Sequence, residues 1–118
     1  MSTITSNVVE NVRVATLTDT KIMGEDASLD VARDLTQLIN EMPETALVLN
    51  LNKVQFMASA MIGKLVLVRN LCKDRSINFS LCSLHGNVAE AIGLVQLDKI
   101  VDLFDDQAGA IRACAGDS

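Results

Sequence analysis

The sequence predicts a single α/β domain in which a mixed sheet of four to five strands packs against about four helices. Along the chain, segments in which apolar and polar residues alternate, as in strands, are followed by segments whose apolar residues have helical spacing. Strands joined through helices pair in parallel, whereas strands joined by a tight turn pair as a hairpin. No linker, repeat or low-complexity segment divides the 118 residues, so we expect one domain with one core.

The first predicted element is a strand over residues 12–17, VRVATL, in which apolar and polar residues alternate as in a half-buried strand. We expect it to pair with a short segment around Val8 and Val9, connected through Glu10 and Asn11. The first two strands are therefore predicted to form a hairpin.

The loop TDTKIMGED leads into an amphipathic helix over residues 27–42, which ends before Pro43, the only proline. Its apolar residues recur at helical spacing: Leu29, Ala32, Leu35, Leu38 and Ile39. The segment that follows, ALVLNL over residues 46–51, is apolar enough for a central strand covered on at least one face.

A second helix is predicted from Ser59 to about Lys73. Most of it is buried, because its apolar residues form one stripe and a flank: Met61, Leu65, Val68 and Cys72, with Ile62 and Val66 beside them. Residues 77–84, INFSLCSL, alternate again as a strand, and residues 85–87, HGN, have the chemistry of a turn.

Three shorter elements complete the predicted domain. A short helix in VAEAIGLVQL carries one apolar face: Val88, Ala91, Ile92 and Val95. KIVDLF is a brief strand or extended segment. The last element is a helix over about residues 105–115. Asp105 and Asp106 favour its N-terminus, because negative charge there interacts well with the helix dipole.

Composition excludes several classes of function. Hydrophobic residues make up 49% of the chain and charged residues 21%, as in globular domains. Aromatic residues are only 3%, which leaves little for stacking nucleobases. The formal net charge of -5 repels phosphate backbones and anionic membranes, so we expect neither nucleic acid nor membrane as a partner.

The cysteines and the N-terminal residues bear on location. Cys72, Cys82 and Cys114 have no CxxC or Cys/His ligand spacing, and we interpret them as small buried hydrophobes in a reducing compartment. MSTITSNVVEN lacks the basic and apolar regions of a signal peptide, and no apolar run approaches the ~20 residues that span a bilayer. The prediction is a soluble cytoplasmic protein.

From about residue 8 to residue 104 the order of elements resembles the STAS domain, a family named for sulfate transporters and anti-sigma-factor antagonists. LVLNLNKVQFMASAMIGKLV is similar to that family's apolar strand, linker and serine at the start of the second helix. INFSLCSLHGNVAEAIGLVQLDKIVDLF is similar to its strand, turn, short helix and closing segment. The resemblance implies one STAS-like domain over residues 1–118, with a core at about 8–104 and a C-terminal helix at about 105–115.

In the bacterial antagonists of this family the motif is Asp-Ser-Ser/Thr-Gly, and its first serine is phosphorylated by a partner anti-sigma factor that is also a kinase. The resemblance puts Ser59 at the phosphoacceptor position. Of the other three motif positions none is kept: Ala58 replaces the aspartate, Ala60 the second hydroxyl and Met61 the glycine.

The residues alone leave three interpretations of Ser59. A serine at a strand-to-helix junction is often an N-cap, worth ~1 kcal/mol. The same position suits a phosphoserine, because a helix N-terminus stabilises negative charge. A catalytic serine would need a base within reach and glycines on both sides, and here the flanks are Met57 and Met61.

Other candidate residues have simpler interpretations. His85 is the only histidine, and as part of a turn it is interpreted as a solvated loop residue rather than a general base. The carboxylates of Asp98, Asp102, Asp105 and Asp106 are interpreted as a solvated face and helix-start charges rather than a metal site. The glycines are scattered, and no GK[ST] motif occurs. We therefore expect no enzyme and no cofactor.

The resemblance implies a non-enzymatic signalling module of the anti-sigma-factor-antagonist type. The expected partner is an anti-sigma factor and serine kinase of the histidine-kinase-like ATPase type. Its docking surface would include Met57, Ala58, Ser59, Ala60 and Met61, with exposed methionines as adaptable contacts, although Met61 also fits the core stripe. We expect a monomer or a weak homodimer, paired through a sheet edge or a helix face.

Two alternatives remain open. A STAS-like fold rich in aliphatic side chains would suit a carrier of a small apolar ligand or lipid. The chain would also suit a structural subunit of a larger signalling assembly, with Ser59 serving only as a helix cap.

Overall fold

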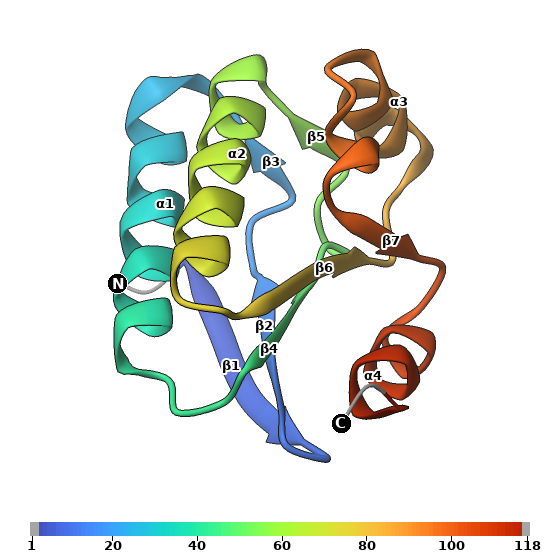
Figure 1. The fold of residues 1–118 in the computed structure, drawn as a ribbon. Helices are drawn as coiled ribbons and strands as arrows, with labels where there is room; N and C mark the ends of the chain where they lie inside the picture. Colours follow the sequence, from blue (N-terminus) through green and yellow to red (C-terminus); the bar gives the residue numbers. More distant parts are fainter. Residues whose placement is uncertain (1–2, 117–118) are drawn as a thin grey trace.

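A computed structural model describes residues 3–116 of the chain (Figure 1). The elements follow in this order: β1 (Ile4–Val9), β2 (Val12–Leu17), β3 (Lys21–Ile22), α1 (Gly24–Glu41), β4 (Ala46–Asn50), β5 (Phe56–Met57), α2 (Ser59–Asp74), β6 (Asn78–Cys82), α3 (Gly86–Leu94), the 3₁₀ turn η1 (Leu97–Lys99), β7 (Asp102–Phe104) and α4 (Gln107–Gly116).

The main sheet has five strands in the order β1-β2-β4-β6-β7. β1 is antiparallel to β2, and every other neighbouring pair is parallel. α1 and α2 lie side by side over one face of this sheet, and α4 lies over the other (Figure 1). The predicted fold class, a mixed sheet packed against four helices, is confirmed.

The turn between β1 and β2 has two residues, Glu10 and Asn11, with φ angles of 51° and 67°. Positive φ at both central residues characterises the turn whose twist matches that of the flanking strands. The predicted hairpin is therefore confirmed, and its first strand is longer than the pair of valines that indicated it.

The central strand β4 is buried along its whole length, because it has helices on both sides. Leu47 and Leu49 pack into the larger core between the sheet and the α1–α2 layer. Ala46 and Val48 point the other way, into a smaller core that includes Ala110 and Ile111 of α4. This double burial explains the continuous apolar run in the sequence.

The structure corrects several predicted boundaries. α1 begins at Gly24, three residues before its predicted start, and Leu29 of its predicted apolar face is 40% exposed. The loop before α1 contains a short strand, β3, which pairs with β5. His85 is followed directly by α3, so the predicted turn at residues 85–87 is a helix start. Val95 lies beyond the end of α3 and is 52% exposed, because the chain turns away there through Gln96 at φ 60°.

Candidate functional site

The short ladder between β3 and β5 positions the start of α2. These strands run parallel, with Lys21 opposite Phe56 and Ile22 opposite Met57. The backbone N–H of Ala58 then donates to the carbonyl of Ile22 at 2.9 Å. Since α1 begins two residues after Ile22, the first turns of α1 and α2 lie next to one another.

Ser59 is the first residue of α2 and is exposed. The N-cap position belongs to Ala58, whose φ of -72° and ψ of 158° are extended, and no side chain caps this helix end. The N-cap interpretation of Ser59 is therefore wrong, because the chain becomes helical one residue earlier than a capping serine requires.

The first turn of α2 has backbone N–H groups available to bind a negative group. The N–H groups of Met61 and Ile62 bond to the carbonyl of Ala58, at 3.0 and 3.2 Å. Those of Ser59 and Ala60 precede the first intrahelical bonds and have no backbone partner within residues 3–116. No acidic residue occurs in this turn, so the positive end of the helix dipole is not neutralised locally.

An ion pair borders this helix start. The Lys64 ammonium lies 3.0 Å from a carboxylate oxygen of Glu25, which joins the first turn of α1 to the second turn of α2. The pair bridges the two helix starts, and it involves Lys64, the lysine of α2 nearest in sequence to Ser59.

The five predicted docking residues differ in exposure. Ser59 is exposed, and Ala58 and Ala60 are half-buried. Met57 and Met61 are only 5% and 0% exposed, because Met57 points from β5 into the core and Met61 lies on the core stripe of α2. The expectation that these methionines are exposed contacts is wrong, and the alternative position of Met61 on the core stripe is confirmed.

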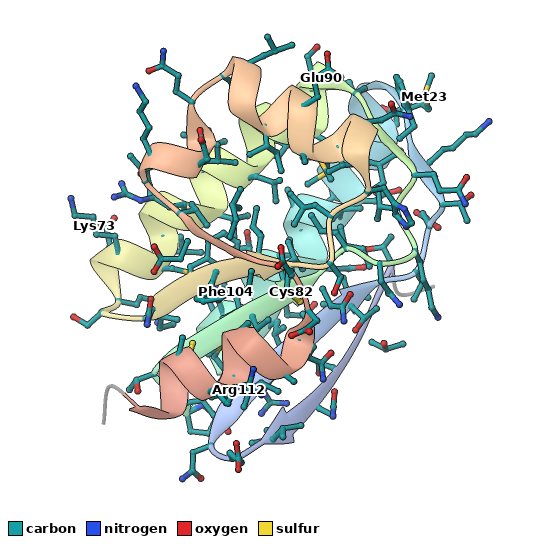
Figure 2. All side chains as sticks on the ribbon, turned by 90° about the vertical axis from the view of Figure 1, so that its right-hand side faces the viewer. Met23, Lys73, Cys82, Glu90, Phe104 and Arg112 are labelled. Carbon is teal, nitrogen blue, oxygen red and sulfur yellow. The ribbon has the colours of Figure 1, made fainter. Side chains whose placement is uncertain are left out.

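Two other apolar side chains are exposed beside the β3–β5 ladder that precedes α2. Phe56, 43% exposed, precedes the inward-pointing Met57 on β5. Met23, 56% exposed, follows β3 beside the start of α2, and Figure 2 shows it at the same end of the molecule as Glu90 of α3. No sequence signal identifies this pair, because β3 and β5 have two residues each and carry no apolar period.

His85 has a structural partner rather than a catalytic one. Its Nε2 lies 2.6 Å from the carbonyl oxygen of Asn52, in the loop after β4. The side chain of Asn50, the last residue of β4, accepts a bond from the Asn52 N–H at 2.9 Å and donates to Gln107 Oε1 of α4 at 2.8 Å. No hydrogen bond joins His85 to Ser59 in the part of the chain that the structure describes.

Of the four candidate carboxylates near the C-terminus, Asp106 is confirmed as a helix-start charge. Asp106 Oδ1 accepts the N–H of Gly109 at 2.7 Å, which caps α4 as its charge predicts. Between residues 3 and 116, no three His, Cys, Asp or Glu side chains gather as metal ligands would.

All three cysteines are free thiols. Cys72 and Cys82 are buried as predicted, and Cys114 is half-buried. Burial raises the pKa of the Cys72 thiol from its ordinary value of 9.0 to about 12, and it also raises that of Cys82. These two thiols stay protonated and unreactive at neutral pH.

The mixed sheet, its helix order and the serine at the start of α2 agree with the sequence match. The sequence model of the STAS domain matches residues 8–110, so the chain belongs to the STAS domain family. Comparison with curated proteins by sequence gives no match. No helix within residues 3–116 is both long enough and apolar enough to cross a membrane.

Solved structures share this fold. An anti-sigma-factor antagonist (STAS) domain protein from Planctomyces limnophilus is 19% identical over 96% of this chain and 98% of its own, with a TM-score of 0.82. The anti-sigma factor antagonist SpoIIAA in its unphosphorylated form is 15% identical over 96% of both chains, with a TM-score of 0.78. The STAS domain of a SulP transporter from Vibrio cholerae is 19% identical over 82% of this chain and 79% of its own, with a TM-score of 0.68.

Proposed function

We propose that this protein is a non-enzymatic signalling module of the anti-sigma-factor-antagonist type. Its partner is an anti-sigma factor that is also a serine kinase of the histidine-kinase-like ATPase type, and phosphorylation of Ser59 controls binding. The observation that carries this proposal is the exposed Ser59 hydroxyl on an uncapped helix start without acidic neighbours in its first turn.

The geometry supports a switch that leaves the fold intact. A phosphoserine brings about -1.5 to -2 charges, and the positive end of a helix dipole stabilises them. The unpaired N–H groups of the first turn are donors for phosphate oxygens. The added charge would then act on the partner's surface rather than on the helix.

The docking surface consists of Ser59 with Ala58, Ala60, Met23 and Phe56. Two large exposed apolar side chains beside a modifiable hydroxyl suit a contact that a phosphate would break, because burying that charge against a partner is costly. Met57 and Met61 support this surface from the core side.

The phosphoacceptor is tested by phosphate incorporation. A switch kinase of the histidine-kinase-like ATPase type is incubated with ATP and the protein, and the intact mass is followed over time. We expect wild type and Ser6→Ala, which removes an exposed hydroxyl from β1, to gain one phosphate, and Ser59→Ala to gain none. Equal incorporation by wild type and Ser59→Ala would refute the assignment.

The missing aspartate of the family motif predicts slow phosphorylation. Ala58→Asp restores a carboxylate beside the acceptor, and we expect it to raise the rate of phosphate incorporation. If wild type incorporates phosphate as fast as Ala58→Asp does, the alanine at position 58 does not slow phosphorylation.

The docking surface is tested with a matched pair of substitutions. Phe56→Asp and Val8→Asp place a carboxylate on side chains that are 43% and 45% exposed, on β5 and β1 respectively. Pull-down of the kinase should fail for Phe56→Asp and Ser59→Asp and should persist for Val8→Asp. Equal recovery by all three would exclude this surface.

A further inference from the structure

A groove lies between α1 and α2, on the side of the helix layer that faces away from the sheet. Its volume is about 580 Å³, and its apolar lining comes from both helices: Leu29 and Ala32 of α1, and Leu67 and Val68 of α2. Leu29 is 40% and Leu67 61% exposed, so the groove presents apolar surface to its surroundings. Leu67 is the one large apolar side chain of α2 that is exposed.

The groove continues the proposed docking surface along α2. Ser59, Gly63 and Leu67 follow one another at intervals of four residues, so they lie on one face of the helix, and all three are exposed. A Cβ atom added at Gly63 would meet nothing within 4 Å, so the space between the other two residues is open. Leu67 lies eight residues from Ser59, which corresponds to about 12 Å along the helix. A partner seated on Ser59 therefore reaches the groove over Gly63.

The proposed docking surface is too small to hold a partner by itself. A stable interface takes about 800 Å² from each partner, contributed by roughly 20–30 residues. The docking surface has five residues, and three of them are a serine and two alanines. The partner must therefore cover adjoining surface as well, and the groove adjoins Ser59 on the same helix and carries exposed leucines on both walls.

The charged side chains of the lining have contacts within this chain. The Lys64 ammonium pairs with Glu25 at 3.0 Å, and the Arg33 guanidinium lies 3.9 Å from a carboxylate oxygen of Asp30. Glu41, the acid of the lining, accepts a long bond of 3.4 Å from the side-chain amide four residues before it. With both signs present and each charge engaged locally, the groove selects an occupant by apolar contact rather than by a strong charge of one sign.

We propose that the groove binds an amphipathic helix of the same anti-sigma factor kinase, an inference that rests on the proposed function. Grooves lined by apolar side chains commonly take the apolar face of such a helix, with anchors at i, i+3 or i+4, and i+7. The lining of α1 extends from Leu29 to Glu41, twelve residues or about 18 Å, which matches a helix of about three turns. Leu29 and Leu67 contact its anchors from the two walls. The groove then supplies affinity that does not depend on the replaced residues around Ser59.

The concentration dependence of phosphorylation tests the groove. The kinase and ATP of the phosphate-incorporation assay are used with increasing concentrations of wild type and variants. Leu67→Asp and Leu29→Asp should each raise KM about tenfold and leave kcat within about twofold, because the groove contact is the same before and during phosphoryl transfer. Leu94→Asp, at the 79% exposed end of α3, is the control and should leave both constants unchanged. Far-UV circular dichroism verifies that all variants are folded.

A cross-link identifies the occupant. Leu67→p-benzoylphenylalanine is irradiated with the kinase, and the linked kinase peptide is sequenced by mass spectrometry. We expect a segment whose apolar residues recur at helical spacing. A link to a segment without this spacing would overturn the helix as the occupant.

The outcomes separate this inference from the proposed function. If wild type is phosphorylated on Ser59 and both aspartate variants keep the KM of wild type, the groove binds no kinase helix and the phosphoacceptor stands. If kcat falls while KM is unchanged, Leu67 acts on the transfer at Ser59 and not on docking, which also overturns the inference. A wild type that the kinase neither binds nor phosphorylates would overturn the proposed function and the inference together.

Discussion

Ala58 and Ser59 are neighbours at the start of α2, and only the first has the extended backbone of an N-cap. We predict that Ala58→Ser stabilises the protein by ~1 kcal/mol, because the new hydroxyl would accept an unpaired N–H of the first turn. Ser59→Ala should change the free energy of unfolding by less than ~0.5 kcal/mol, since alanine is well tolerated inside a helix. Urea unfolding of the two variants measures both effects. A loss of ~1 kcal/mol in Ser59→Ala would return the capping function to Ser59.

The Cys72 thiol makes the free energy of unfolding depend on pH in the alkaline range. Its pKa is raised by burial from 9.0 to about 12 in the folded protein. The unfolded chain therefore releases this proton first, and the contribution to stability is complete below pH 9 and is lost as the pH rises toward 12. The loss approaches ~1.4 kcal/mol per pH unit within this window.

We predict that Cys72→Ala flattens this dependence. The variant should be less stable at neutral pH, because it loses buried sulfur contacts, and its stability should fall less steeply than that of wild type between pH 9 and 11. Urea unfolding at several pH values compares the two slopes. Identical slopes would show that Cys72 ionises as readily in the folded protein as in the unfolded chain.

The loop after β4 connects three elements through a small set of polar contacts. The Asn50 amide links this loop to α4 through Gln107, and His85 at the start of α3 bonds to the carbonyl of Asn52. Asn50 is only 8% exposed, so its hydrogen bonds form in a poorly solvated place, where an unmade bond costs more than at the surface.

A double-mutant cycle tests the contact between β4 and α4. Asn50→Ala should cost ~1–3 kcal/mol, because it also leaves the Asn52 N–H unpaired, and Gln107→Ala should cost less. We expect a coupling free energy of ~0.5–1.5 kcal/mol between the two substitutions in urea unfolding. Asn70→Ala, which removes an exposed bond from Arg69, serves as a control and should change stability little. Strict additivity of the Asn50 and Gln107 effects would contradict the bond.

Helices and strands long enough for their apolar pattern to repeat could be predicted from the sequence, and very short ones could not. The central strand and the first two helices each contain enough residues for an apolar pattern to repeat. β3 and β5 have two residues each, so they carry no period and exist only because the fold brings residues 21–22 and 56–57 together. At the start of α3 the sequence predicts a turn where the structure has a helix, because His-Gly-Asn fits both.

The same limit explains the errors at the candidate site. Ser59 could be identified from its place between a strand and a helix, but the exposure of its neighbours depends on where β5 ends and how α2 is rotated. A change of one residue in that junction exchanges the inward and outward sides of the strand. The exposed pair is therefore Met23 and Phe56, and the two methionines closer to Ser59 in sequence are buried.

At the scale of the whole molecule, the parallel strands bring several helix starts to one end. α1, α2 and α3 each begin after a strand that runs toward the same end of the molecule (Figure 1). This end, beyond the carboxyl ends of the strands, is where open α/β sheets commonly bind their ligands. The proposed docking surface, around the start of α2, lies at this end.

The two-residue turn of the first hairpin also affects the time course of folding. A hairpin closes in about 1–10 µs, and the contact between β1 and β2 spans the shortest stretch of chain in the sheet. The parallel contact between β2 and β4 must wait until α1, 18 residues long, has closed a much longer loop. During that interval β2 already has its outer neighbour, and only its inner edge is open to a wrong strand. The hairpin thus halves the unpaired backbone that the growing sheet exposes to other chains.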